Sequence, residues 1–177
     1  MQFSSGKETE NVMIYKATNL IAETFDLYDV DYRITEENEV SSVDASFNLE
    51  SGQEIVVRFI SDDEGNDVAI RIFGLVRDVP VLKRTDVMEL CSALCAEGRY
   101  FKFYLHESGC VNVEADLPAR IDDDCLGECS FELLSRIART INTEFHRFKD
   151  VLFGKSERNM GNPIELLRAI NELRNQP

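Results

Sequence analysis

Apolar residues recur at spacings of three and four in three stretches of the chain, and this period predicts amphipathic helices. The first helix is expected at about residues 10–28. The second is expected from Thr85, a residue type that caps helix N-termini, to about Gly98. The third is expected at about residues 130–148. Each helix carries an apolar stripe that has to pack against another part of the protein.

The stripe of the third helix is long and regular, and its apolar positions are Phe131, Leu134, Ala138, Ile141, Phe145 and Phe148. Such a stripe fits either the core of the domain or a seam that faces a partner helix. The core is the favoured interpretation, because every helix that lies on a sheet needs an apolar stripe.

Apolar and polar residues alternate in five other stretches, which predicts β-strands. Three of these stretches lie between the first two helices, at residues 43–49, 55–60 and 68–76. The other two form a hairpin within residues 97–118, where Glu107, Ser108 and Gly109 supply the turn. Short connections imply antiparallel pairing, and a lone Gly74 inside a strand indicates a bulge or a close contact. The order of elements predicts an α+β fold with an antiparallel sheet.

The hairpin has one apolar and one mixed face. Its apolar residues alternate with a second set, which consists of Tyr100, Lys102, Tyr104 and His106. If the apolar set faces the helices, the second set lines the open face of the sheet. Tyrosine suits interfaces, because its ring buries area while its hydroxyl stays hydrogen-bonded. These four residues are the candidate partner or dimer surface, and the alternative is an ordinary solvated sheet face.

Composition and charge narrow the class of partner. The chain has 177 residues, 44% of them hydrophobic, which suits one domain with a sizeable core. A net charge of −14 argues against nucleic acids and anionic membranes, because both are bound mainly through Lys and Arg. Residues 1–9 form a polar leader without the apolar centre of a signal peptide, and no run approaches the length of a membrane-spanning helix. We therefore expect a cytoplasmic protein. The acidic charge indicates either simple solubility, which is the favoured interpretation, or a basic protein partner.

Five cysteines without an export signal indicate reduced thiols. Two pairs share one spacing, Cys91 with Cys95 and Cys125 with Cys129. Four thiolates can hold zinc, but structural zinc sites usually place two residues between paired cysteines, and here there are three. The competing interpretation is that Cys91 and Cys95 belong to the stripe of the second helix, because buried Cys behaves as a small hydrophobic residue. A redox pair is a further alternative.

Residues suited to catalysis are scarce. The two histidines are His106 and His146, and the sequence has no nucleophile elbow, phosphate-binding glycine loop or HExxH pair. The acidic run at residues 62–67 lacks the ligand spacing of a calcium loop and is expected to be a hairpin turn. A second acidic run at residues 122–124 is expected to be a loop ahead of the third helix. We expect no enzyme activity, no catalytic residues, no cofactor and no metal.

The end of the chain is set apart from a domain at residues 10–150 by a loop-like stretch at residues 151–161. Asn162 as a cap, Pro163 in the first turn and Glu165 three positions after the cap predict a last helix at residues 162–177.

Several stretches of the chain match one known family when they are taken together: residues 33–37, 68–76, 88–95, 100–104 and 113–118. They resemble the YbjN family, described as bacterial sensory transduction regulators, over roughly residues 11–148. Cys91, Ser92 and Cys95 depart from the family, which commonly has asparagines near these positions. The resemblance implies a fold similar to type III secretion chaperones, with helices mainly on one face of a twisted antiparallel sheet, often as a homodimer. The family has no catalytic residues to carry over.

The sequence thus predicts a non-enzymatic protein-binding domain, a regulator or chaperone-like binder, with a twisted sheet of about five strands and an extra C-terminal helix. The expected assembly is a homodimer. The alternative function is a metal or redox sensor built on the cysteines Cys91, Cys95, Cys125 and Cys129.

Overall fold

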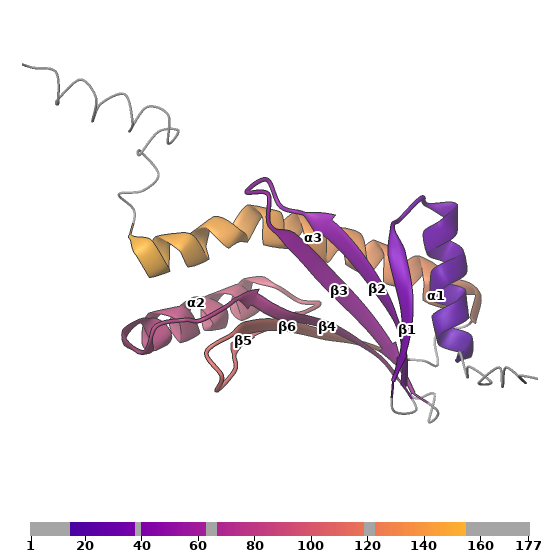
Figure 1. The fold of residues 1–177 in the computed structure, drawn as a ribbon, viewed down its shortest axis with the longest axis horizontal. Helices are drawn as coiled ribbons and strands as arrows, with labels where there is room; N and C mark the ends of the chain where they lie inside the picture. Colours follow the sequence, from indigo (N-terminus) through magenta and orange to yellow (C-terminus); the bar gives the residue numbers. More distant parts are fainter. Residues whose placement is uncertain (1–14, 38–39, 63–66, 119–122, 155–177) are drawn as a thin grey trace, which may run out of the picture.

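The computed structural model describes residues 15–37, 40–62, 67–118 and 123–154, and it confirms the α+β fold (Figure 1). Its elements in chain order are α1 (Lys16–Leu27), β1 (Tyr32–Glu37), β2 (Val40–Asn48), β3 (Glu54–Ser61), β4 (Asp67–Val76), the 3₁₀ turn η1 (Val81–Lys83), α2 (Arg84–Glu97), β5 (Lys102–Leu105), β6 (Val111–Pro118) and α3 (Asp123–Phe153). The strands form one antiparallel sheet in the order β1-β2-β3-β4-β6-β5.

The sheet has six strands, one more than the sequence predicts. The additional strand is β1, which lies at the edge of the sheet beside β2. Its side chains are all partly or fully exposed, and Tyr32 and Ile34 are its apolar residues. So short an alternation gives no clear strand signal, because a solvated edge strand needs few apolar positions.

The core lies between the sheet and the helices. Phe25 of α1 packs edge-on against Phe59 of β3, with ring centroids 5.4 Å apart. The ring centroids of Phe148 of α3 and Phe103 of β5 lie 6.1 Å apart. The four aromatic side chains are buried. The helices therefore anchor both halves of the sheet on the same apolar side.

The apolar stripe of α3 belongs to this core. Leu134, Ile141, Phe145 and Phe148 are buried, while Phe131 is partly buried against the same cluster. The core interpretation is confirmed, so this stripe is not free to face a partner helix.

Two helix starts differ from the sequence-based prediction. α2 begins at Arg84, so Thr85 lies inside the helix and is not its cap. The reason is that the chain is already turning in η1, where Lys83 N donates to Pro80 O at 2.8 Å. α3 begins at Asp123, so residues 123–124 of the predicted loop are helical, while residue 122 lies outside the described residues. Acidic residues in a first helical turn are favoured by the helix dipole.

The far end of α3 reaches Phe153, beyond the predicted domain boundary at residue 150. Gly154 then adopts φ +86°, a conformation in which glycine ends a helix without strain. The leader at residues 1–9, the rest of the predicted loop from residue 155 and the predicted helix at residues 162–177 lie outside the described residues.

Candidate partner-binding surface

One row of charged residues crosses all strands on the face of the sheet opposite the helices. Residues that pair across neighbouring strands share a face. The strand registers connect this row, which we call the charged row, in the order Arg33, Asp44, Arg58, Arg71, Glu114 and Lys102. Four cations and two anions therefore stand side by side in a protein whose net charge is −14.

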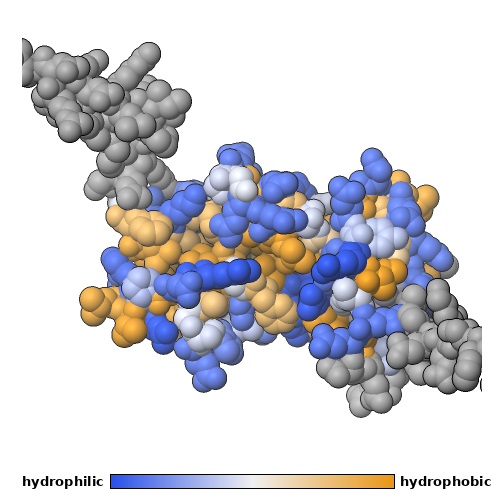
Figure 2. Space-filling model, in the orientation of Figure 1, coloured by the Kyte–Doolittle hydropathy of each residue, from blue (hydrophilic) through white to orange (hydrophobic). Residues whose placement is uncertain are grey.

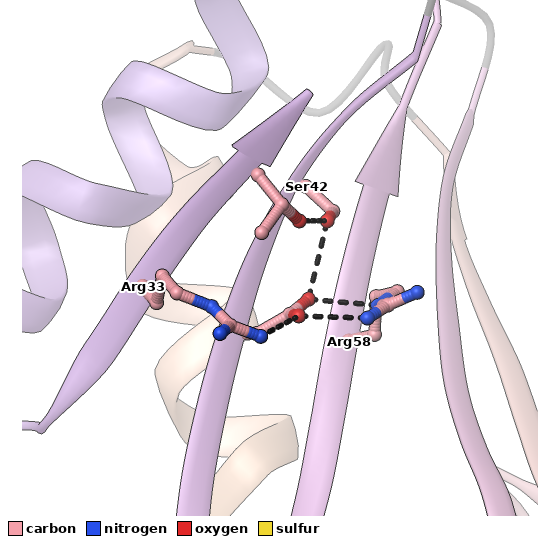
Figure 3. A network of polar contacts seen from close by, with 5 residues as sticks. Arg33, Ser42 and Arg58 are labelled. Carbon is pink, nitrogen blue, oxygen red and sulfur yellow. Dashed lines mark hydrogen bonds and ion pairs between the residues drawn. The ribbon is translucent and has the colours of Figure 1, made fainter. Parts of the chain in front are cut away.

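The Asp44 carboxylate is the centre of the first half of this row (Figure 3). Its side chain is only 3% exposed. Arg58 donates two hydrogen bonds of 2.8 Å to its two oxygens, and Arg33 adds an ion pair at 3.6 Å. Ser42 donates a further hydrogen bond of 3.1 Å, and Thr35 lies 2.7 Å from the Ser42 hydroxyl. The buried charge is therefore fully compensated by neighbours from three strands.

The ion pair with Asp44 also determines the orientation and the pKa of the Arg58 guanidinium. Its hydrogen bonds with Asp44 raise the pKa of the guanidinium, and partial burial opposes that effect only in part. Arg58 remains 39% exposed at the side chain. The two-point contact with Asp44 holds one face of the guanidinium while the other faces solvent, where a partner can reach it.

Arg71 is the centre of the second half of the charged row. One of its terminal nitrogens donates to the backbone carbonyls of Ile70 at 2.9 Å and Ala115 at 2.7 Å. The other donates to Asp116 at 2.9 Å. Lys102 stands beyond it, opposite Glu114 on the edge strand β5. The row is therefore rigid in its middle and exposed at its two ends.

Exposed apolar side chains lie beside the charged row on the open face; we call them the apolar row. Val56 lies two residues from Arg58 on β3, and Phe73 lies two residues from Arg71 on β4, each just past the last paired residues of these two strands. Asn112 and Tyr104, which pair across β6 and β5, lie beyond Phe73. Val56 is 43% exposed and Phe73 is 56% exposed. Figure 2 shows hydrophobic surface interrupted by hydrophilic side chains across the middle of the molecule. Phe73 is the more exposed of these two apolar side chains and is the aromatic one.

A bulge in β4 sets the direction of the Phe73 side chain in the apolar row. The register with β6 shifts between Ile72 and Val76, and Gly74 lies within the shift at φ +70°. The amide oxygen of Asn112 accepts the Gly74 N–H at 2.9 Å. The bulge that the lone glycine indicates is therefore confirmed. It exposes Phe73 on the open face, because bulges redirect the side chains beside them.

The four candidate surface residues do not all lie on one strand. Lys102 and Tyr104 lie on β5, and the Tyr104 hydroxyl accepts a hydrogen bond from Asn112 at 3.4 Å. Tyr100 precedes β5, and the Arg136 guanidinium of α3 lies 4.8 Å from its ring centre. His106 lies in the β5–β6 turn beside Ser108. Strand β5 spans only four residues, so Tyr100 and His106 lie outside it.

Most of the charged row went unrecognised in the sequence. Each member is a charged residue at a polar position of a strand, which is an ordinary feature of antiparallel sheets. The signal that unites them is the register, which depends on how distant strands pair and is not carried by any one strand.

The cysteines do not form a common site. Cys91 is buried, and burial raises the pKa of its thiol to about 12. The Cys95 sulfur contacts the backbone N–H and carbonyl of Phe103, at 3.2 and 3.3 Å. Cys125 is exposed at the start of α3. Within the described part of the chain, no three His, Cys, Asp or Glu side chains are placed to hold a metal ion. Metal ligation needs thiolates, which burial of Cys91 disfavours.

The histidines stand on separate elements. His106 shares a hydrogen bond with Ser108 in the β5–β6 turn, at 2.9 Å, and His146 lies on α3, where it contacts the Thr143 carbonyl. Both contacts are local in sequence. Residues 63–66 of the acidic turn lie outside the described residues.

Comparisons with known proteins give no family: no protein-family model, no curated protein and no solved structure matches the chain. Among the helices described here, none is both long and apolar enough to cross a membrane.

Proposed function

We propose that the chain is a non-enzymatic protein-binding domain, a YbjN-like regulator or chaperone-like binder, which holds its partner on the open face of the sheet. The observation that carries the proposal is the pair of rows on that face. This face carries cationic side chains at Arg33, Arg58 and Lys102 together with exposed apolar side chains at Val56 and Phe73.

This combination fits a partner segment with carboxylates next to apolar side chains. Interfaces are enriched in aromatic residues and Arg, and exposed aromatic anchors contribute much of the binding energy. The charged row carries an excess of cations, whereas the rest of the protein is strongly acidic. Attraction to the row and repulsion elsewhere would guide an acidic segment to this face.

The proposal includes a homodimer and a cytoplasmic location. All five cysteines are free thiols, which suits a reducing compartment. The homodimer is supported by the resemblance to the YbjN family and by the exposed Phe73, which would be covered in a dimer. The net charge of −14 still argues against nucleic acid and membrane partners.

Photo-crosslinking in the cell tests the proposal. Benzoylphenylalanine placed at Phe73 should give a specific adduct, because the residue lies in the proposed interface. The same group at Met88, which is 58% exposed on α2, is the matched control and should give none. An adduct of twice the chain mass identifies a homodimer, and any other specific mass identifies a client.

A charge reversal in the same experiment links the adduct to the charged row. Arg33→Glu together with Lys102→Glu should abolish the Phe73 adduct without unfolding the protein, because both side chains are exposed. Equal crosslinking from Phe73 and Met88, or an adduct that survives the reversal, would contradict the proposal.

A further inference from the structure

A second candidate site lies on the helix side of the molecule, next to the end of the charged row at Lys102. The C-terminal end of α2, the connection to β5 and the middle of α3 enclose a cleft of about 550 Å³. That volume lies within the range of small-molecule sites, about 300–1,000 Å³. The cleft is open on one side, so a ligand can enter without a change of fold.

Part of the cleft wall is apolar. Leu94 of α2, Phe101 and Phe103 line it and are otherwise buried in the core. Tyr100 adds an exposed ring, which stacks under the Arg136 guanidinium at 4.8 Å from the ring centre. An aromatic or aliphatic body fits such a lining, because it would remove both its own surface and that of the rings from water.

Two arginines of the cleft have no counter-ion. Arg99 and Arg139 both line it, and neither guanidinium makes an ion pair or hydrogen bond with any residue in the described ranges. Unpaired guanidiniums beside an apolar wall are the groups that bind an organic anion.

The charge balance indicates how many charges the ligand carries. Arg136 is paired with Glu132, while Arg147 lies against both Glu97 and Glu144 of the cleft. The charged residues that line the cleft are Arg99, Arg136 and Arg139 against Glu97 and Glu144, which leaves one net positive charge. The negative end of the α2 dipole also lies here, at Glu97 and Gly98, and disfavours a multiply charged phosphate.

We propose that this cleft binds a small organic acid with a single carboxylate on an aromatic or aliphatic body. Arg99 and Arg139 hold the carboxylate, and Leu94, Phe101 and Phe103 contact the apolar body. The cleft borders one end of the charged row, because Arg99 and Tyr100 also line the hollow beside Lys102 and Glu114.

The test is a titration of the full-length protein with 4-phenylbutyrate, followed by calorimetry and by amide NMR shifts. The neutral control ligand is 4-phenylbutan-1-ol, which keeps the ring and chain without the charge. We expect one molecule per chain, shifts around residues 94–103 and 136–144, and affinity for the alcohol at least about tenfold lower, the size expected for a lost charge-assisted contact.

Charge-removing variants locate the contact. Arg99→Gln and Arg139→Gln should each weaken binding of the acid about tenfold, and Arg139→Lys should lose less, because it keeps the charge but not the two-point contact. Arg33→Gln removes the same charge from the open sheet face, where the side chain is 73% exposed, and should leave the affinity within about twofold.

Four results would overturn the inference. These are equal affinity for the acid and the alcohol, the same loss in Arg33→Gln as in Arg139→Gln, displacement of the acid by inorganic phosphate at equal concentration, and absence of binding at millimolar acid. Thermal melting of each variant confirms that it is folded, which is expected because Arg139 and Arg99 are exposed.

Discussion

At the scale of single residues, the structure depends on how it compensates Asp44, a buried carboxylate on an otherwise open sheet face. Removing an ion from water costs several kcal/mol, which is offset only when its partners are well placed. Here Arg58 supplies two hydrogen bonds and Ser42 a third. Asp44 is therefore a structural residue that also fixes one cation of the proposed interface.

Arg58→Met should lower the free energy of unfolding by about 2 kcal/mol, because it leaves the Asp44 charge buried with one distant cation. Arg33→Met is the control and should cost less than about 0.5 kcal/mol, because that pair is long and its arginine exposed. Urea unfolding measures both. Adding Asp44→Asn to Arg58→Met should recover part of the loss, and a further loss instead would contradict the role given to the carboxylate.

Cys91 supplies a pH-dependent prediction. Burial raises the pKa of its thiol from 9.0 to about 12, so the folded protein holds the proton more tightly than the unfolded chain. The resulting contribution to stability is complete below pH 9 and is lost as the pH rises from 9 to 12. The free energy of unfolding should therefore fall over this window less steeply in Cys91→Ala than in the parent protein. Equal slopes would show that Cys91 does not titrate there.

At the scale of elements, α1 and α3 approach each other closely at a glycine. Gly127 of α3 faces Thr24 of α1, and a Cβ atom at this position would lie 1.8 Å from the Thr24 hydroxyl oxygen. It would also lie 2.8 Å from the backbone carbonyl of Leu20. Beside this contact, Tyr28 stacks on Phe131 with ring centroids 3.9 Å apart. Glycine is therefore required for the helices to cross this closely.

Gly127→Ala should destabilise the protein by about 2 kcal/mol, although alanine is the better helix former, because α1 has to move away from α3. Thr143→Ala on the exposed side of α3 is the matched control and should be neutral or slightly stabilising. Urea midpoints give both values. Combining Gly127→Ala with Thr24→Ala should restore only part of the stability, because the Leu20 carbonyl remains in the way.

At the scale of the whole molecule, the charge distribution is uneven. The chain is acidic overall, yet one face of the sheet carries a row with more cations than anions, flanked by Val56 and Phe73. The α3 stripe, the other surface that could have formed a dimer, is buried in the core. A dimer would therefore have to use the open sheet face or another exposed surface.

Light scattering at tens of micromolar protein tests the assembly. We expect a dimer that Phe73→Ser converts to a monomer, because the substitution removes an exposed aromatic anchor. Met88→Ser removes a similarly exposed apolar side chain from α2 and should leave the dimer intact. A monomeric parent protein would contradict the homodimer, and a dimer insensitive to Phe73→Ser would place its interface elsewhere.

The local patterns of the sequence determined the elements and their buried sides. The apolar stripe from Leu134 to Phe148 predicted which face of α3 packs in the core. The alternation of apolar and polar residues in β2 to β6 predicted strands with one apolar side. These features follow from the chain alone, because helical and strand periods place neighbours in sequence on one face whatever they pack against. The sequence did not predict the edge strand β1, because a solvated edge strand needs little apolar alternation.

Only the tertiary structure decided which side chains stand together. The register aligns Arg33, Asp44 and Arg58 from three strands, and the path between α2 and β5 brings Arg99 to the same cleft as Arg139 of α3. Neither arrangement is a property of a local segment. Both result from packing between residues far apart in sequence, where a shift of one residue in a strand would turn every side chain to the other face.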